Sequence, residues 1–197
     1  MSTSEKSKSL TDLAIRTSVD PAFAGLRETG AALVLGEGPF DARIAVVGEA
    51  PGYYENLQGR PFVGDAGILL GKLLEYGGIE RGQCWVTNLV KYQPPGNRNP
   101  RYGETLSGRI YLRHELAIIG PELVVLCGKY AFQSVFPGLS ISKFHGTPLR
   151  TEARRYLPVF HPAACLRDST RLHETYEDFA KIKELLRRDE PNSGLST

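Results

Sequence analysis

The chain has 197 residues, a typical length for one domain that buries a core of its own. Its 24 basic and 22 acidic side chains give a net charge of +2, too small for a protein that binds nucleic acid by charge alone. No run of residues is apolar for long enough to span a membrane, and the polar first residues lack a signal-peptide core. The three cysteines are an odd number at wide spacing, which argues against a disulfide framework. We therefore expect a globular protein of the cytoplasm.

Apolar runs and amphipathic helical patterns alternate along the chain. The patterns predict strands at residues 43–49, 84–90, 122–127 and 156–160, and helices at residues 65–76, 103–119, 129–136 and 172–187. The helices are expected to bury apolar stripes that include Leu106, Ile110, Leu116 and Ile119, and Tyr176, Phe179, Ile182 and Leu186. This order predicts an α/β domain with a mainly parallel sheet over residues 10–188. Residues 1–9 are expected to be disordered, residues 140–158 to hold a small hairpin and residues 189–197 to form a flexible tail.

Three polar loops follow the ends of predicted strands, at residues 48–62, 88–98 and 161–167. Because the carboxyl ends of parallel strands lie at one edge of a sheet, we expect the loops to converge there. The first loop opens the segment Gly48–Gly67, which has five glycines but neither the lysine of a P-loop nor the G-x-G-x-x-G pattern. Its carboxylates and aromatic rings indicate a neutral, flat ligand.

The side chains in these loops match the parts of a nucleobase and its sugar. The ring of Phe62 offers a face for stacking, and the amide of Asn88 offers a donor beside an acceptor, complementary to the imide edge of uracil. A carboxylate such as Glu49 holds a water and stabilises a cationic sugar-like transition state. His161 has the chemistry to hydrogen-bond an oxygen that gains charge as a base departs. Together these groups suit the cleavage of an N-glycosidic bond.

Three segments also carry a family resemblance. In chain order they are GEGPFDARIAVVGEAPGYYENLQGRPFVGDAG, VTNLVKYQPPGNRNP and FHPAACLR. In order and spacing the chain resembles the uracil-DNA glycosylase superfamily, closest to its family-four branch, over roughly residues 36–188. The resemblance implies a three-layer α/β/α sandwich around a central, mainly parallel four-stranded sheet. It implies a monomeric, metal-independent enzyme of base-excision repair that binds uracil-containing DNA and releases the base.

The resemblance also implies a role for each residue at a motif position. Glu49 would hold or activate the attacking water, with Glu55 and Asn97 supporting the water and the loop, and His161 would stabilise the departing uracilate. Phe62 would stack on the flipped base, Asn88 would read its edge, and the backbone at Ala50 and Gly52 would touch O2. The loop at residues 161–167, which includes Ala163, would enter the minor groove with Leu166 as the wedge. Apart from the resemblance, Arg98 and Arg167 are candidates for a rim that faces the DNA phosphates, with a plain surface charge as the alternative.

The chain departs from the family pattern at three places. Most family-four enzymes hold an iron–sulfur cluster with four cysteines, whereas residues 1–41 here have none and Tyr92 stands where the third commonly lies. We therefore expect no cluster and predict that local packing around Tyr92 replaces it. Ala163 stands where the family often has a serine that contacts phosphate, and Tyr53 and Tyr54 stand where relatives are usually acidic.

Other interpretations remain open for several residues and for the function. Glu55 is as well explained as a solvated carboxylate or by a pair with Arg60, and Asn97 by a role in the turn. Cys165 is an alternative wedge to Leu166. The function has two rivals: a non-catalytic DNA- or uracil-binding module on the same fold, and a glycosylase for hypoxanthine or xanthine.

Overall fold

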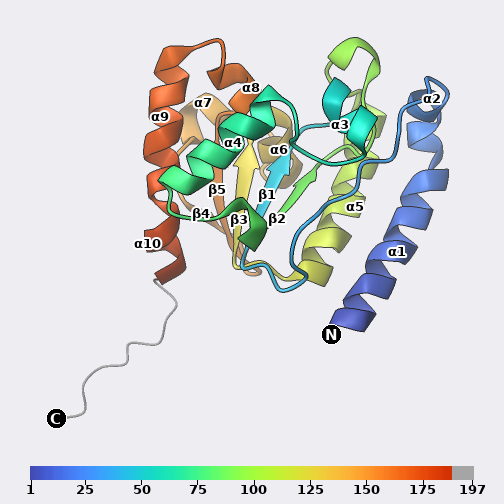
Figure 1. Ribbon diagram of the computed structural model, residues 1–197, viewed down its shortest axis with the longest axis horizontal. Coiled ribbons are helices and arrows are strands. Elements are labelled where there is room, and N and C mark those ends of the chain that lie inside the picture. The colour runs from blue at the N-terminus through green and yellow to red at the C-terminus, as the bar shows by residue number, and fades with distance from the viewer. Residues whose placement is uncertain (188–197) are drawn as a thin grey trace.

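The computed structural model describes residues 1–187 of the chain, so the predicted tail at residues 189–197 lies outside the described residues. Figure 1 shows a central sheet covered by helices on both faces. The strands are β1 (Ile44–Gly48), β2 (Cys84–Asn88), β3 (Leu123–Cys127), β4 (Leu149–Arg150) and β5 (Arg155–Val159). The helices are α1 (Thr3–Val19), α2 (Ala24–Arg27), α3 (Tyr53–Gln58), α4 (Asp65–Tyr76), α5 (Tyr102–Ile119), α6 (Gly128–Val135), α7 (Ile141–Phe144), α8 (Pro162–Cys165), α9 (Ser169–Ala180) and α10 (Ile182–Arg187). Short 3₁₀ turns lie at η1 (Pro21–Phe23), η2 (Arg81–Gln83) and η3 (Pro95–Asn97). No helix within residues 1–187 is both long enough and apolar enough to cross a membrane.

The sheet has the strand order β2-β1-β3-β5-β4. The strands β2, β1, β3 and β5 are parallel, and the two-residue strand β4 pairs with β5 in the antiparallel direction. The mainly parallel sheet is confirmed, but it has five strands where four were predicted, because the expected hairpin places β4 beside β5. The carboxyl ends of the parallel strands, at Gly48, Asn88, Cys127 and Val159, lie at one edge.

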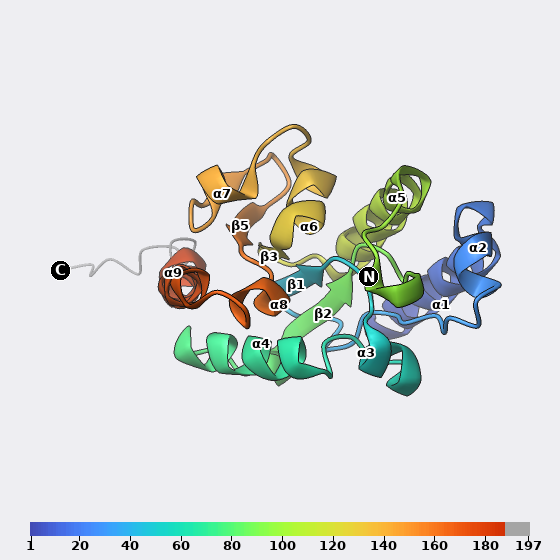
Figure 2. The same cartoon turned by 90° about the horizontal axis from the view of Figure 1, so that it is seen from above.

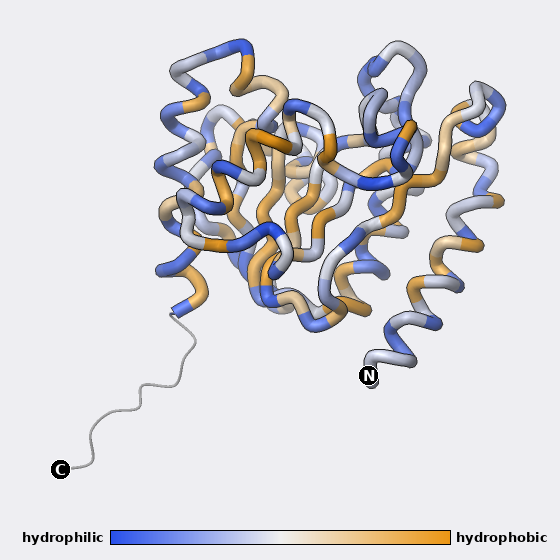
Figure 3. Tube along the Cα trace, viewed as in Figure 1, coloured by the Kyte–Doolittle hydropathy of each residue, from blue (hydrophilic) through white to orange (hydrophobic). Residues whose placement is uncertain are grey.

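The strands are buried on both faces, and alternate residues serve two separate cores. In β1, Ile44 and Val46 pack with α4, α9 and α10, while Ala45 and Val47 pack with α5 and α6. This is the burial pattern that a parallel sheet between two layers of helices requires. Figure 2 shows the two helical layers from above, and Figure 3 shows the apolar strands between helices with polar outer faces. The three-layer α/β/α sandwich is therefore confirmed.

The N-terminal segment differs from the sequence prediction. Residues 3–19 form α1, although residues 1–9 were expected to be disordered. The side chain of Ser2 accepts a hydrogen bond from the Glu5 N–H, and the Glu5 carboxylate accepts one from the Ser2 N–H, so the helix begins with a capping box. The Lys6 ammonium donates to the carbonyls of Phe40 and Ile119, both at 2.9 Å. These tertiary contacts stabilise a segment whose composition alone is polar.

Two helices also differ in detail from their predictions. On α5, Leu116 and Ile119 are buried as expected, but Leu106 and Ile110 are exposed because the helix packs through a neighbouring stripe that contains Leu112. The predicted helix at residues 172–187 is two helices, α9 and α10, separated by a turn at residue 181. Its expected stripe is kept, since Phe179 and Ile182 are buried on both sides of the turn.

Candidate active site

A cavity of about 300 Å³ lies at the carboxyl edge of the sheet. Eleven of the twelve site residues predicted from the sequence line it, and Leu166 does not. Pro51, Ala66 and Pro94 also line the cavity and were not predicted. The lining residues are Glu49, Ala50, Pro51, Gly52, Glu55, Phe62, Ala66, Asn88, Pro94, Asn97, Arg98, His161, Ala163 and Arg167. The predicted convergence of the three loops is thus observed.

The amide of Asn88 and the ring of Phe62 meet above Gly48. A Cβ atom at Gly48 would lie 2.6 Å from Cζ of Phe62 and closer still to Oδ1 of Asn88, so only glycine fits between them. Asn88 is buried, and its side-chain amide has no hydrogen-bond partner within residues 1–187. The amide atoms of Asn88 are not among the fully buried polar atoms that lack a partner, so they reach the surface of the cavity. The amide is therefore available to a ligand that lies against Phe62.

The backbone of Asn88 is held from behind by a buried ion pair. The ammonium of Lys91 donates to the Asn88 carbonyl at 2.8 Å and lies 2.6 Å from the Glu115 carboxylate. Thr87 also donates to Glu115, and the Trp85 indole N–H donates to the other oxygen of that carboxylate at 3.0 Å. Moving either charged group away from its partner would leave a buried charge without compensation, which is costly. The pair therefore keeps one arrangement. It holds the end of β2 in one conformation.

Phe62 has an unusual backbone conformation. Within residues 1–187, Phe62 and Asn97 are the two non-glycine residues with positive φ, each at 54°, and both line the cavity. Gly67 has no Cβ, and one at that position would overlap the carbonyl of Phe62. Strained conformations of this type persist where the surrounding structure enforces them, and they concentrate at functional sites. The strain therefore marks the same cavity as the motifs do.

Glu55 acts as a connector within the first loop. One of its carboxylate oxygens accepts hydrogen bonds from the N–H groups of Val63 and Gly64, both at 2.8 Å, and the other accepts one from Gly52 at 3.1 Å. The alternative pair with Arg60 is wrong, because Arg60 binds Glu37 at 2.8 Å. Glu55 thus fixes the loop that carries Phe62, a positioning role that needs no contact with a reacting atom.

Glu49 follows β1 directly and lies partly buried in the cavity. Its carboxylate has no hydrogen-bond donor within residues 1–187, and burial raises its pKa to about 6, against the opposing effect of the Lys129 ammonium. A carboxylate with a pKa near neutrality is suited to accept a proton from water. Lys129 and Tyr130, which follow β3, are neighbours of Glu49 that the sequence analysis missed. The sequence does hold a signal for them: Gly128 follows a predicted strand, as Gly48 and the first loop do.

His161 lines the same cavity as Glu49, and its ring is stacked on Phe62 at a centroid distance of 5.7 Å. The N–H of Ala163 donates to Nδ1 at 3.2 Å, so in the neutral ring the proton is on Nε2. Burial lowers the pKa of His161 to about 4. The imidazole is therefore neutral near pH 7 and offers one N–H donor, at Nε2. Gly128, which has a φ of +88°, leaves room for the Cβ atom of His161, because a Cβ on residue 128 would lie only 2.9 Å from it.

The second loop is held by its own contacts. The guanidinium of Arg98 forms two hydrogen bonds with the buried Glu104 carboxylate, at 2.7 and 2.9 Å, and its predicted contact with DNA stays a prediction. The amide oxygen of Asn97 accepts a hydrogen bond from Gln93 at 2.7 Å, and its side chain is exposed at the cavity. The loop is therefore shaped before any ligand binds.

The third loop forms the short helix α8. Leu166 is 52% exposed beside Arg167, a placement that suits a wedge. Cys165, the alternative wedge, is buried 3.3 Å from the Thr175 hydroxyl and is therefore wrong for that role. Ala163 is exposed at the cavity.

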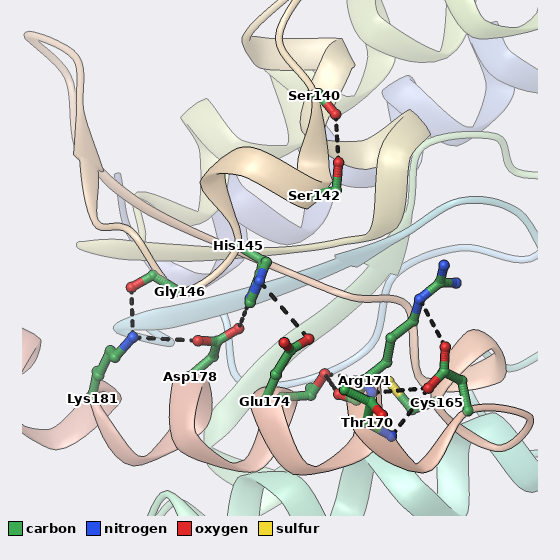
Figure 4. A network of polar contacts seen from close by, with 12 residues as sticks. Ser140, Ser142, His145, Gly146, Cys165, Thr170, Arg171, Glu174, Asp178 and Lys181 are labelled. Carbon is green, nitrogen blue, oxygen red and sulfur yellow. Dashed lines mark hydrogen bonds and ion pairs between the residues drawn. The ribbon is translucent and has the colours of Figure 1, made fainter.

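A polar network supports the strand that leads into this loop (Figure 4). Nδ1 of His145 lies 2.9 Å from the Asp178 carboxylate, and Lys181 bridges Asp178 to the carbonyl of Gly146 at 2.8 Å. The His145 ring packs on Phe160 at a centroid distance of 4.3 Å. Because Phe160 precedes His161, the network connects α9 to the residue before the cavity.

Comparison with known proteins gives the same assignment as the motifs. The model of the uracil DNA glycosylase superfamily matches residues 35–187. The chain belongs to this superfamily. It is 38% identical over 162 residues to the Type-4 uracil-DNA glycosylase of Thermotoga maritima, covering 80% of this chain and 84% of the relative. The Type-4 enzyme of Sulfurisphaera tokodaii is 39% identical over 77% of this chain and 74% of its own length. The Type-4 enzyme of Archaeoglobus fulgidus is 38% identical over 84% of this chain and 88% of its own length.

The cysteines of the chain do not fit the iron–sulfur cluster implied by its family-four resemblance. Such clusters need about four thiolates, and the three cysteines are all buried in the apolar core. Burial raises the pKa of Cys84 to about 12, which opposes the thiolate form that a metal needs. Within residues 1–187, no group of three or more His, Cys, Asp or Glu side chains is placed to hold a metal. Tyr92 is buried, with its ring 5.7 Å from that of Phe23.

Proposed function

We propose that this protein is a monofunctional uracil-DNA glycosylase, which hydrolyses the N-glycosidic bond of deoxyuridine in DNA and leaves an abasic site. The observation that carries the proposal is the unpartnered amide of Asn88, which lies with the Phe62 ring at the position where a Cβ of Gly48 would be. A flat base with an imide edge satisfies both groups at once. The superfamily membership and the three Type-4 relatives support the same substrate.

In the proposed reaction the carboxylate of Glu49 holds a water against C1′ of the flipped nucleotide. As the C1′–N1 bond breaks, its electron pair moves into the uracil ring and charge develops on O2. The Nε2–H of neutral His161 donates a hydrogen bond to that oxygen. Glu49 accepts a proton as the water oxygen bonds to C1′. The uracilate then takes up a proton to leave as uracil.

The other predicted residues have supporting roles in this proposal. The backbone of Ala50 and Gly52 lies at the cavity where O2 would be, and Asn97 supports the water. Leu166 would fill the gap left by the flipped base, and Arg167 would approach the phosphates. Ala163 lies on the same DNA-facing loop without a hydroxyl to offer a phosphate. All of these groups come from one chain, so a monomer suffices, and we retain the cytoplasm as the location.

We further propose that the enzyme acts without an iron–sulfur cluster. Tyr92 stands where relatives of the family-four branch commonly carry the third cysteine, and its ring packs on Phe23, which also lies 6.1 Å from the ring of Tyr111. These rings supply buried contact area in place of metal–thiolate bonds.

The test of the function is the release of base from a labelled oligonucleotide. We expect free uracil and alkali-dependent strand cleavage from uracil-containing DNA. No cleavage is expected before alkali, because the cavity lining within residues 1–187 has no lysine and Lys91 of the second motif is buried against Glu115. Oligonucleotides with hypoxanthine, xanthine, cytosine and thymine complete the panel. Binding of uracil-containing DNA without release of uracil would overturn the proposal in favour of a non-catalytic module.

A further inference from the structure

Two exposed aromatic side chains on α3 have no part in the proposed reaction. Tyr53 is 62% exposed and Tyr54 is 54% exposed, and their rings meet edge to face at a centroid distance of 5.4 Å. Leu57, one turn further along, is 69% exposed. Exposed aromatic surface of this extent, gathered on one short helix, is typical of a binding surface.

The tyrosine pair is continuous with the cavity. Tyr53 follows Gly52 in the chain and Tyr54 precedes Glu55, and both of these neighbours line the cavity. Figures 1 and 2 place α3 at the carboxyl edge of the sheet, the same edge that carries α8 and its wedge candidate Leu166. A DNA strand that delivers a nucleotide to the cavity therefore passes near the pair.

The pair is also held in place before any ligand binds. The carboxylate of Glu55 joins the start of α3 to Val63 and Gly64, and the amide oxygen of Asn56 accepts a hydrogen bond from the Ala32 N–H at 2.7 Å. A Cβ atom at Gly64 would lie 3.3 Å from the Tyr54 ring, so that ring rests near the loop backbone. The backbone of the helix that carries the rings is therefore fixed beforehand, so its ordering adds no entropic cost on binding.

We propose that Tyr53 and Tyr54 form a stacking subsite for an unpaired nucleobase next to the flipped uracil. This subsite depends on the proposed function in one respect, which is that a uracil nucleotide occupies the cavity. An unpaired base has a free face for an aromatic ring, whereas a base in duplex DNA already stacks on its neighbours. The subsite therefore favours single-stranded over double-stranded substrate. Arg167, in the cavity lining, adds a positive charge for the backbone of the same strand.

The test compares a double variant, Tyr53→Ala with Tyr54→Ala, against the matched Tyr→Phe double variant. Base stacking on an aromatic side chain is worth about 1–3 kcal/mol by alanine substitution, so the alanine variant should bind single-stranded DNA on the order of tenfold more weakly. The phenylalanine variant, and Tyr76→Ala at an equally exposed tyrosine on the far end of α4, should bind within about twofold of wild type. Duplex binding should change little in all three variants.

A spectroscopic experiment locates the contact. The chain has one tryptophan, the buried Trp85, so Tyr53→Trp adds one exposed fluorophore. Its emission should be quenched by a single-stranded oligonucleotide with a base beside the uracil analogue site, and much less when that neighbour is a tetrahydrofuran abasic residue. Equal quenching by both oligonucleotides, or an alanine variant that loses single-stranded and duplex binding equally, would overturn the proposal. If the wild type sediments as a dimer and the alanine variant as a monomer, the tyrosine pair binds a second copy of the chain, and the proposal is overturned. Both binding measurements are independent of catalysis. If the protein binds the DNA but releases no uracil, only the proposed function is refuted, and the stacking subsite is still tested.

Discussion

The substitution Glu49→Gln should move activity and stability in opposite directions. The pKa of Glu49 is about 6 in the folded protein, against an ordinary 4.5, because burial disfavours its charged form. This difference corresponds to about 2 kcal/mol for a fully shielded group, and to about 1–2 kcal/mol once the partial exposure of Glu49 to the cavity is allowed for. The ionised carboxylate is thus a cost to folding that an uncharged isostere removes.

The sign of the pH dependence follows from proton binding. Between the ordinary pKa of 4.5 and the folded pKa of about 6, the folded protein binds more protons at Glu49 than the unfolded chain does. The contribution of Glu49 to stability is therefore neutral below about pH 4.5 and becomes unfavourable as the pH rises through about 6. Glu49→Gln should be about 1–2 kcal/mol more stable than wild type at pH 8, and no more stable at pH 4.

Activity should respond in the opposite sense. Removal of a general base costs about 10²- to 10⁴-fold in rate, and single-turnover release of uracil at pH 8 measures it. In the wild type, the ionised fraction of Glu49 falls to about a tenth at pH 5, so kcat/KM should fall about tenfold between pH 7 and pH 5.

Urea unfolding at pH 4 and pH 8 supplies the stability measurement, and Glu122→Gln supplies the control. Glu122 is a surface carboxylate at the opposite end of the sheet, and its hydrogen bond with Arg43 lowers its pKa, so its substitution should not stabilise the protein at pH 8. A Glu49→Gln variant that is less stable than wild type at pH 8, or that keeps more than about a tenth of its activity, would refute the reasoning.

Three further outcomes are expected. Gly48→Ala should cost about 100-fold or more in kcat/KM with a folded circular-dichroism spectrum, because the added methyl displaces Asn88 or Phe62; near wild-type turnover would contradict this geometry. Lys91→Met should destabilise the protein by about 3–5 kcal/mol in urea unfolding, because it leaves the Glu115 carboxylate buried without its cation, and a stable variant would show that the pair is dispensable. Anaerobically purified protein should lack both iron and a visible absorption band, and positive results in both assays would establish a cluster.

The sequence predicted the parts of the fold that depend on local pattern. The four parallel strands and α4 are close to the predicted ranges, because a buried strand is a short continuous apolar run and an amphipathic helix has a local period. The predictions were less good where tertiary contacts decide. Residues 3–9 are helical because α1 packs on α5 and Lys6 reaches Ile119, which the polar composition does not show. Leu106 and Ile110 are exposed because α5 packs against α1 and α6 through other residues, and only those tertiary contacts decide which stripe of α5 is buried.

The site shows the same division. The residue types and the order of the three motifs place Glu49, Asn88 and His161 at strand ends, and the sequence by itself determined that these groups belong to one site. Only the tertiary structure decided their state: which amide is left without a partner, which nitrogen of His161 carries the proton, and that Glu55 is occupied by three backbone donors. Burial, hydrogen bonding and charge depend on atoms that are distant in the chain, and no local pattern encodes those neighbours. For the same reason Lys129 became visible as a neighbour of Glu49 only after β3 was placed beside β1.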